Sequence, residues 1–238
     1  MYSFMFKGQS CVDFGMSPTD IITVKQGRKN RPQEQIDIYE IPYRNEELII
    51  HNGKYKPYEQ EFEFVLRDPT LILQVNAWLS GRGKLYLEND VEKFGRWGYY
   101  MASVVEDWEY EMKHSTFHFT VKFLVDPFLY SDSGQRKNTY VTQPIKLFNN
   151  HTFYSQPYIK INGSGNITLM INNQVCTFSD VTDYIEIDSS LMIAYKDTLN
   201  QGSKMEGDFP VFDVGMNNIS WSGNVTSLEV MGRWRDLG

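Results

Sequence analysis

The sequence predicts an all-β fold with one short helix, divided into two domains. Apolar and polar residues alternate along most of the chain with the two-residue period of strands, and only one segment has helical spacing. The density of charged residues also falls partway along the chain, close to a polar, turn-rich stretch at residues 131–138. We therefore predict one domain over residues 1–135 and a second over residues 136–238.

Strands of an antiparallel, sandwich-like sheet are predicted for most of the first domain. The clearest alternation runs through Phe117, Phe119, Val121 and Phe123, and a less regular one through Phe62, Phe64 and Leu66. Such alternation buries one face of each strand. Residues 83–87 and 91–100 are expected to form two more strands, joined by a turn at Glu88-Asn89-Asp90.

A single helix interrupts these strands. Asp68 is a suitable N-cap, and Pro69 in the first turn matches the residue preference of helix starts. Four apolar residues then fall on one helical face: Leu71, Val75, Trp78 and Leu79. Gly81 is expected to end the helix, whose apolar face then packs on the sheet.

The second domain is predicted to contain strands and turns only. The expected strands cover residues 158–161, 167–171, 184–187, 191–195, 218–221 and 225–231, with Gly163-Ser164-Gly165 as a turn. Spacings of about 8 to 12 residues between turns are typical of a β-sandwich or jelly roll. The last strand, within residues 225–238, either completes this domain or returns to the first.

Charge and composition exclude several classes of protein. The 238 residues include 23 Lys and Arg against 30 Asp and Glu, a net charge of −7, which disfavours specific binding to nucleic acid. No stretch reaches the roughly 18 apolar residues of a membrane helix, so no membrane contact is expected. Cys11 and Cys176 lack metal-knuckle spacing and are expected to be buried thiols.

No catalytic, metal-binding or cofactor-binding constellation is predicted. The histidines are His51, His114, His118 and His151, and they match no zinc motif. Nucleophile-elbow, P-loop and dinucleotide fingerprints are all absent. A hydrolase of the glycosidase type needs two carboxylates facing each other across a cleft, and the sequence identifies no such pair.

Two kinds of residue are candidates for contacts. Lys25, Arg28, Lys29 and Arg31 form the one basic run of an acidic chain. This run is either a solvated loop or a contact surface, which would face a neighbouring subunit or a tube built from other subunits. The 15 Tyr, 15 Phe and 5 Trp suit a core, an interface or a sugar-stacking surface. Tyr184 and Trp221 are the residues we expect to contact a carbohydrate if one is bound.

Several segments, taken in order, resemble one known family. The N-terminal ones are Phe4-Met5-Phe6-Lys7-Gly8-Gln9-Ser10 and Asp13-Phe14-Gly15-Met16, followed by the helix with Trp78 and Leu79, then Gly83-Lys84-Leu85 and Asp126-Pro127-Phe128. The C-terminal ones are Gly207-Asp208-Phe209-Pro210-Val211, residues 215–226 and Arg233-Trp234-Arg235. This series resembles the distal tail proteins of long, non-contractile-tailed bacteriophages, especially those of Gram-positive hosts.

The resemblance implies a structural virion protein without catalytic residues or cofactors. Its first domain would assemble, typically as a homohexamer, into a ring that continues the lumen of the tail tube and lets DNA pass. The ring would join the major tail protein to the tail-associated lysin or tail-tip protein. The second domain would resemble galectins and carbohydrate-binding modules and would hold receptor-binding parts of the baseplate. Such a protein is made in the bacterial cytoplasm and resides at the tail tip of the virion.

A second function belongs to a different class. The chain could instead be a soluble carbohydrate-binding module whose second domain recognises a bacterial cell-wall polysaccharide on the host surface. This alternative requires Tyr184 or Trp221 to be exposed, because a sugar ring stacks on an aromatic face. A galectin-like fold alone does not establish sugar binding.

Overall fold

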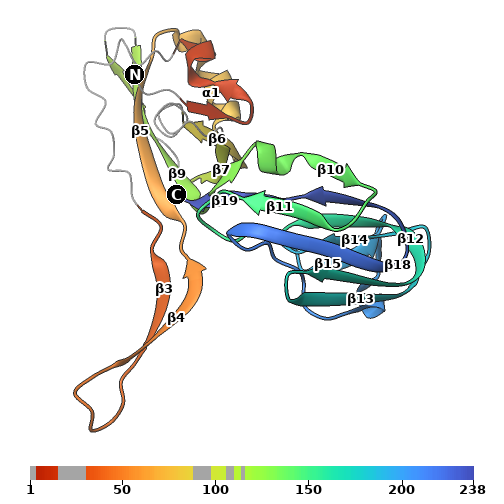
Figure 1. Ribbon diagram of the computed structural model, residues 1–238. Helices are drawn as coiled ribbons and strands as arrows, with labels where there is room; N and C mark the ends of the chain where they lie inside the picture. Colours follow the sequence, from red (N-terminus) through yellow and green to blue (C-terminus); the bar gives the residue numbers. More distant parts are fainter. Residues whose placement is uncertain (1–3, 16–30, 88–97, 106–109, 114–115) are drawn as a thin grey trace. The chain divides into compact units, whose positions relative to one another are not determined.

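The computed structural model describes residues 4–15, 31–87, 98–105, 110–113 and 116–238. It divides into two compact units: unit 1 comprises Met1–Leu129 and Leu237–Gly238, and unit 2 comprises Tyr130–Asp236. The prediction of an all-β fold with one short helix is confirmed for the described residues, whose sheets are built from antiparallel strands (Figure 1).

Unit 1 is built on one large sheet. Its strands are β1 (Phe4–Phe6), β2 (Gln9–Ser10), β5 (Tyr58–Leu66), β6 (Arg82–Leu87), β7 (Gly98–Val104), β8 (Tyr110–Lys113), β9 (Thr116–Ser131) and β19 (Arg235–Leu237). The order is β19-β9-β7-β6-β1-β2, and β5 and β8 also pair with β9. At the C-terminus, Gly238 donates a backbone hydrogen bond of 2.9 Å to the carbonyl of Pro127. Leu237 and Gly238 group with unit 1, whereas Arg235 and Asp236, the first two residues of β19, are counted with unit 2.

The predicted helix lies between β5 and β6 and begins as expected. Asp68 accepts a hydrogen bond from the backbone N–H of Thr70 (2.9 Å), and a short 3-10 turn, Pro69–Leu71, leads into α1 (Ile72–Trp78). Trp78 is buried and its indole Nε1–H donates to the carbonyl of Phe6 at 2.7 Å. The ring of Phe4 stacks on Trp78 with 5.5 Å between centroids, so the helix and the first strand share one aromatic core.

A second, larger sheet forms unit 2. Its strands are β10 (Lys137–Tyr140), β11 (Ile145–Asn149), β12 (Tyr158–Ile171), β13 (Gln174–Val181), β14 (Tyr184–Asp188), β15 (Ile193–Lys196), β16 (Leu199–Asn200), β17 (Met205–Glu206) and β18 (Gly215–Met231). The order is β10-β18-β12-β14-β15-β16; in addition β11 pairs with β18, and β13 pairs with β12 and β17.

The turn predicted at Gly163-Ser164-Gly165 is wrong, because β12 continues through these residues. Two register shifts occur there, and β12 changes its partner at this point: Tyr158–Asn162 pair with β14, and Gly165–Ile171 pair with β13. Bulges are how one strand bends and passes from one layer of a sandwich to the other. The long strands β12 and β18 therefore serve both halves of unit 2 and enclose its core.

Candidate assembly surface

A two-stranded hairpin in unit 1 belongs to neither large sheet. Its strands are β3 (Glu34–Tyr39) and β4 (Leu48–Tyr55), joined by residues 40–47, and we call the whole hairpin the arm. Figure 1 shows the arm as a separate ribbon that runs out beyond the end of β5. Among the described residues, its two strands pair only with each other.

The amino-acid sequence of the arm explains why it forms strands. In β3, Ile36 and Ile38 alternate with polar residues, which is the pattern of a strand with one apolar face. In β4, the unbroken run Leu48-Ile49-Ile50 is typical of a strand that is covered on both faces. β-branched residues favour this extended backbone.

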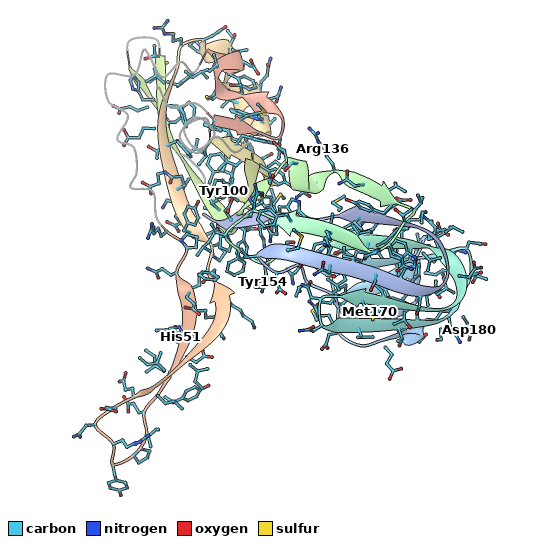
Figure 2. All side chains as sticks on the ribbon, viewed as in Figure 1. His51, Tyr100, Arg136, Tyr154, Met170 and Asp180 are labelled. Atoms are coloured by element: carbon cyan, nitrogen blue, oxygen red, sulfur yellow. The ribbon has the colours of Figure 1, made fainter. Side chains whose placement is uncertain are left out.

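The pairing register places apolar side chains on both faces of the arm. Ile38 lies opposite Ile49 on one face, and Tyr39 lies opposite Leu48 on the other. Six large apolar side chains are each between 41% and 53% exposed: Ile36, Ile38, Tyr39, Leu48, Ile49 and Ile50. None of them belongs to the buried cores of the two units. Figure 2 shows the side chains around His51 with no drawn side chain of another element over them.

The base of the arm, in contrast, is attached to unit 1. The ring of Tyr55 meets the edge of Phe128 in β9 with 6.1 Å between centroids, and just below it the backbone N–H of Lys56 donates to the carbonyl of Gln33 at 2.9 Å and joins the two ends of the hairpin. Near the base, His51 Nδ1 lies 3.0 Å from the Glu34 carboxylate. The base of the arm therefore contacts the rest of unit 1. The apolar side chains of residues 36–39 and 48–50, which we call the shaft, are uncovered.

The predicted interface residues did not include the arm. Lys25, Arg28 and Lys29 lie outside the described residues, and Arg31 is exposed. The sequence contains a signal for the arm in Leu48-Ile49-Ile50, an apolar run typical of a strand that is covered on both faces. Between residues 34 and 55 the arm has five acidic and two basic side chains, a net charge of −3 without His51.

Trp221 is not the exposed ring that we predicted. Its side chain is only 7% exposed and packs in the core of unit 2. Trp221 of β18 lies directly opposite Leu169 of the neighbouring strand β12, which belongs to the same core. The expectation was wrong because, where a strand bends, the sequence does not show on which face of the strand a Trp lies. Its backbone N–H is also in use, since it donates to the side-chain oxygen of Gln143 at 2.7 Å.

Tyr184 lies on the solvent side of β14 and is partly exposed. Its hydroxyl donates a hydrogen bond to the Asp197 carboxylate, which raises the pKa of Tyr184 to about 12. The Nζ atoms of Lys160 and Lys196 lie 3.9 Å and 5.0 Å from the centre of its ring. A sugar that stacks on Tyr184 would have to displace these cations from the ring.

No arrangement for catalysis or metal binding is found in the described part of the chain. Within it, no group of three or more His, Cys, Asp or Glu side chains could hold a metal ion. Cys11 and Cys176 are buried, and burial together with the nearby Asp208 raises the pKa of Cys176 to about 11. None of the described helices has the length and apolar character needed to cross a membrane.

The similarity of this chain to known proteins lies in its fold. No protein-family model and no curated protein sequence matches the chain. Among solved structures, the fold matches the crystal structure of SPP1 Dit (gp 19.1), described as a paradigm of the hub adsorption apparatus in phages that infect Gram-positive bacteria. The two chains share 10% identity and a TM-score of 0.71 over 97% of this chain and 98% of that one. The resemblance inferred from sequence is thus matched in the fold of the whole chain.

Proposed function

We propose that the chain is a structural protein of a phage tail tip, a hub at the distal end of a non-contractile tail. Copies of it form a ring, most simply a hexamer, between the major tail protein and the tail-associated lysin or tail-tip protein. Support comes from a fold shared over nearly the whole chain with a phage hub protein. The match covers 97% of this chain and so includes residues of both units.

The observation that carries the proposal is the arm. A half-exposed Ile or Leu leaves about 1 kcal/mol of burial unused, and the arm has six large apolar side chains in this state. Large exposed apolar surfaces are rare in soluble monomers, whereas interfaces between subunits bury them. A ribbon with two apolar faces suits a position between protein surfaces.

A second copy of the chain is the partner that best fits the arm's charge. The arm carries a net charge of −3, and the basic run from Lys25 to Arg31 supplies four positive side chains. A contact between the arm of one copy and the basic run of the next is a head-to-tail contact, which closes into a ring when its rotation fits the number of copies. Opposite charges would fix the register of this contact.

The channel and the second unit have complementary roles in this proposal. An acidic chain of net charge −7 suits a lumen through which DNA passes without binding. Unit 2 holds receptor-binding or other baseplate proteins on the outside of the ring. The assembly resides in the virion at the tail tip, and no enzymatic step is assigned to it.

Native mass spectrometry with negative-stain imaging tests the ring, using the chain alone and mixed with its tail-tube and tail-tip proteins. Six copies of 27.8 kDa give 166.8 kDa, and the images should show an open centre. Ile38→Glu and Ile50→Glu, one on each face of the arm, should abolish the ring. Leu73→Glu, at a 76% exposed position of α1, is the matched control and should retain it. No ring under either condition would refute the proposal.

Sugar binding by unit 2 is the second candidate, favoured by Tyr184. Lys160 lies over its ring and 3.9 Å from Glu186, so a sugar that stacks on the ring must displace the ammonium group and would then have Lys160 and Glu186 beside it as hydrogen-bonding partners. Glycan-array binding that is lost in Tyr184→Ala and retained in Tyr154→Ala, another partly exposed tyrosine of unit 2, would support it. The absence of any glycan binding would leave unit 2 with a purely structural role.

A further inference from the structure

We propose that the arm is mostly open in the free chain and closes into its hairpin only when a second copy covers its two faces. This inference rests on the proposed function, and it adds that folding of the arm is coupled to assembly of the ring. It follows from three features of the arm: its pairing, its side chains and its connecting loop.

The pairing of the arm provides little stability of its own. β3 and β4 form a two-stranded sheet, and among the described residues no third strand extends it. An isolated two-stranded hairpin is marginally stable at best in water. Local stability is low wherever few apolar contacts are buried and backbone hydrogen bonds face solvent.

The side chains of the arm do not supply the missing stability. The pairs Ile38–Ile49 and Tyr39–Leu48 lie on opposite faces, so the apolar side chains cannot gather into one cluster. Each of the four is about half exposed. The fixed contacts occur at the base, through Tyr55 with Phe128 and Lys56 with Gln33, and they leave the shaft without support.

The loop between the strands also opposes spontaneous closure. Stable hairpins favour connections of two residues with tight turns, whereas eight residues, 40–47, join β3 to β4. Within this loop Tyr43 has a φ of +67° and a fully exposed side chain. A register shift between Gln35 and Ile36 interrupts the ladder near the base.

A second copy supplies what the free arm lacks. In this proposal it covers both faces of the shaft, and its basic run brings four positive charges to an arm of net charge −3. When a segment folds on binding, the free energy needed to order it reduces the net free energy of binding and so weakens the affinity. Single contacts between copies should therefore be weak, and a ring in which every arm is covered should form cooperatively.

Hydrogen–deuterium exchange of the full chain tests the inference in dilute monomer and in the assembled ring. In the monomer, amides of β3 and β4 should be protected less than about 10-fold, while those of β12 are strongly protected as an internal reference. In the ring, protection of the arm should rise by about 100-fold or more. A ring whose arm amides show the same protection as in the monomer overturns the inference and leaves the proposed function intact. Absence of any ring refutes both.

A covalent link across the arm provides a second, independent test. Asp37 and Ile50 lie directly opposite each other, so Asp37→Cys with Ile50→Cys allows a disulfide that holds the hairpin closed. The reduced form of the same double variant is the matched control, because it has lost the same side chains, and Cys11 and Cys176 are buried. The oxidised form should assemble at a protein concentration about 10-fold lower than the reduced form. Equal assembly of the two forms overturns the inference.

Discussion

Arg233 and Asp188 form a two-point ion pair inside unit 2. The Nη1 and Nη2 atoms of Arg233 lie 2.6 Å and 2.7 Å from the two carboxylate oxygens of Asp188. Asp188 also accepts hydrogen bonds of 3.1 Å from the backbone N–H groups of Ser190 and Leu191. Arg233 follows the end of β18, and its own N–H donates to the carbonyl of Gly134 at 2.8 Å. One ion pair thus ties together the segment after β18 and the turn after β14.

Asp188→Asn should destabilise unit 2 in a pH-dependent way. Burial alone would raise the pKa of Asp188, but hydrogen bonds from Arg233, Leu191 and Ser190 outweigh it and lower the pKa. A lowered carboxyl pKa contributes stability above the unfolded-state pKa of about 3.9 and loses it as the pH falls through the folded-state pKa. We expect the variant to lose about 3 kcal/mol at pH 7 and to approach the wild type below about pH 4. Urea unfolding, followed through amide exchange in β14, measures the difference.

Removing the other partner provides the control for this pair. Arg233→Ala should cost a similar amount at pH 7, because it leaves a buried carboxylate without its counter-charge. The double variant should cost clearly less than the sum of the two single variants, since both remove the same interaction. Strict additivity would contradict the assigned role of the pair.

Gly223→Ala should be much more harmful than Gly165→Ala. Both glycines have positive φ, +100° and +77°, so alanine is strained at each. A Cβ at Gly223 would also collide with the carbonyl oxygen of Asn166 on the adjacent strand, whereas a Cβ at Gly165 meets nothing within 4 Å. We expect a loss of about 1 kcal/mol at Gly165 and about 3 kcal/mol at Gly223, measured by thermal unfolding. Equal losses would mean that β12 and β18 separate easily at this point.

The elements that sequence predicts well are those fixed by neighbouring residues. The helix was identified because Asp68, Pro69 and the spacing of Val75 and Trp78 act within a few residues of each other. The alternating strand β9 was found for the same reason, since burial alternates along it as the sequence does. Both signals are local and need no knowledge of the rest of the fold.

Features that depend on contacts between residues far apart in the sequence were harder to predict. β12 and β18 continue through predicted turns because Gly163 and Gly223 each let the facing strand approach closely. The predicted boundary near residue 135 differs from the division after Leu129, since Gly134 packs against Trp234 within unit 2. Burial of Trp221 depends on the same bent strands. None of these contacts has a signature within a short stretch of sequence.

Trp78→Phe should destabilise unit 1 while preserving its shape. Phe can keep the stacking with Phe4, but it cannot donate the buried 2.7 Å hydrogen bond to the carbonyl of Phe6. That carbonyl would lose a buried donor, so the expected cost is about 2 kcal/mol. Leu73→Ala, on the exposed side of the same helix, should cost less than about 0.5 kcal/mol. Chemical denaturation with exchange at β6 amides distinguishes the two variants.

Salt sensitivity of the ring should depend on the basic run. Replacing Arg28, Lys29 and Arg31 by Ala removes three charges and takes the net charge from −7 to −10. If the run contacts the acidic arm of the next copy, the variant should assemble at about 10-fold higher protein concentration at low salt, and added salt should weaken it less than the wild type.

A matched triple variant separates this local contact from the general effect of charge. Arg136, Lys137 and Lys146 are exposed basic residues of unit 2, and replacing them by Ala gives the same net charge of −10. Rings of this control should keep the wild-type salt dependence. If both triple variants weaken assembly equally, repulsion between acidic copies explains the loss, and the basic run is a solvated loop. If neither does, the arm assembles through its apolar faces alone, because those are the contacts that salt does not screen.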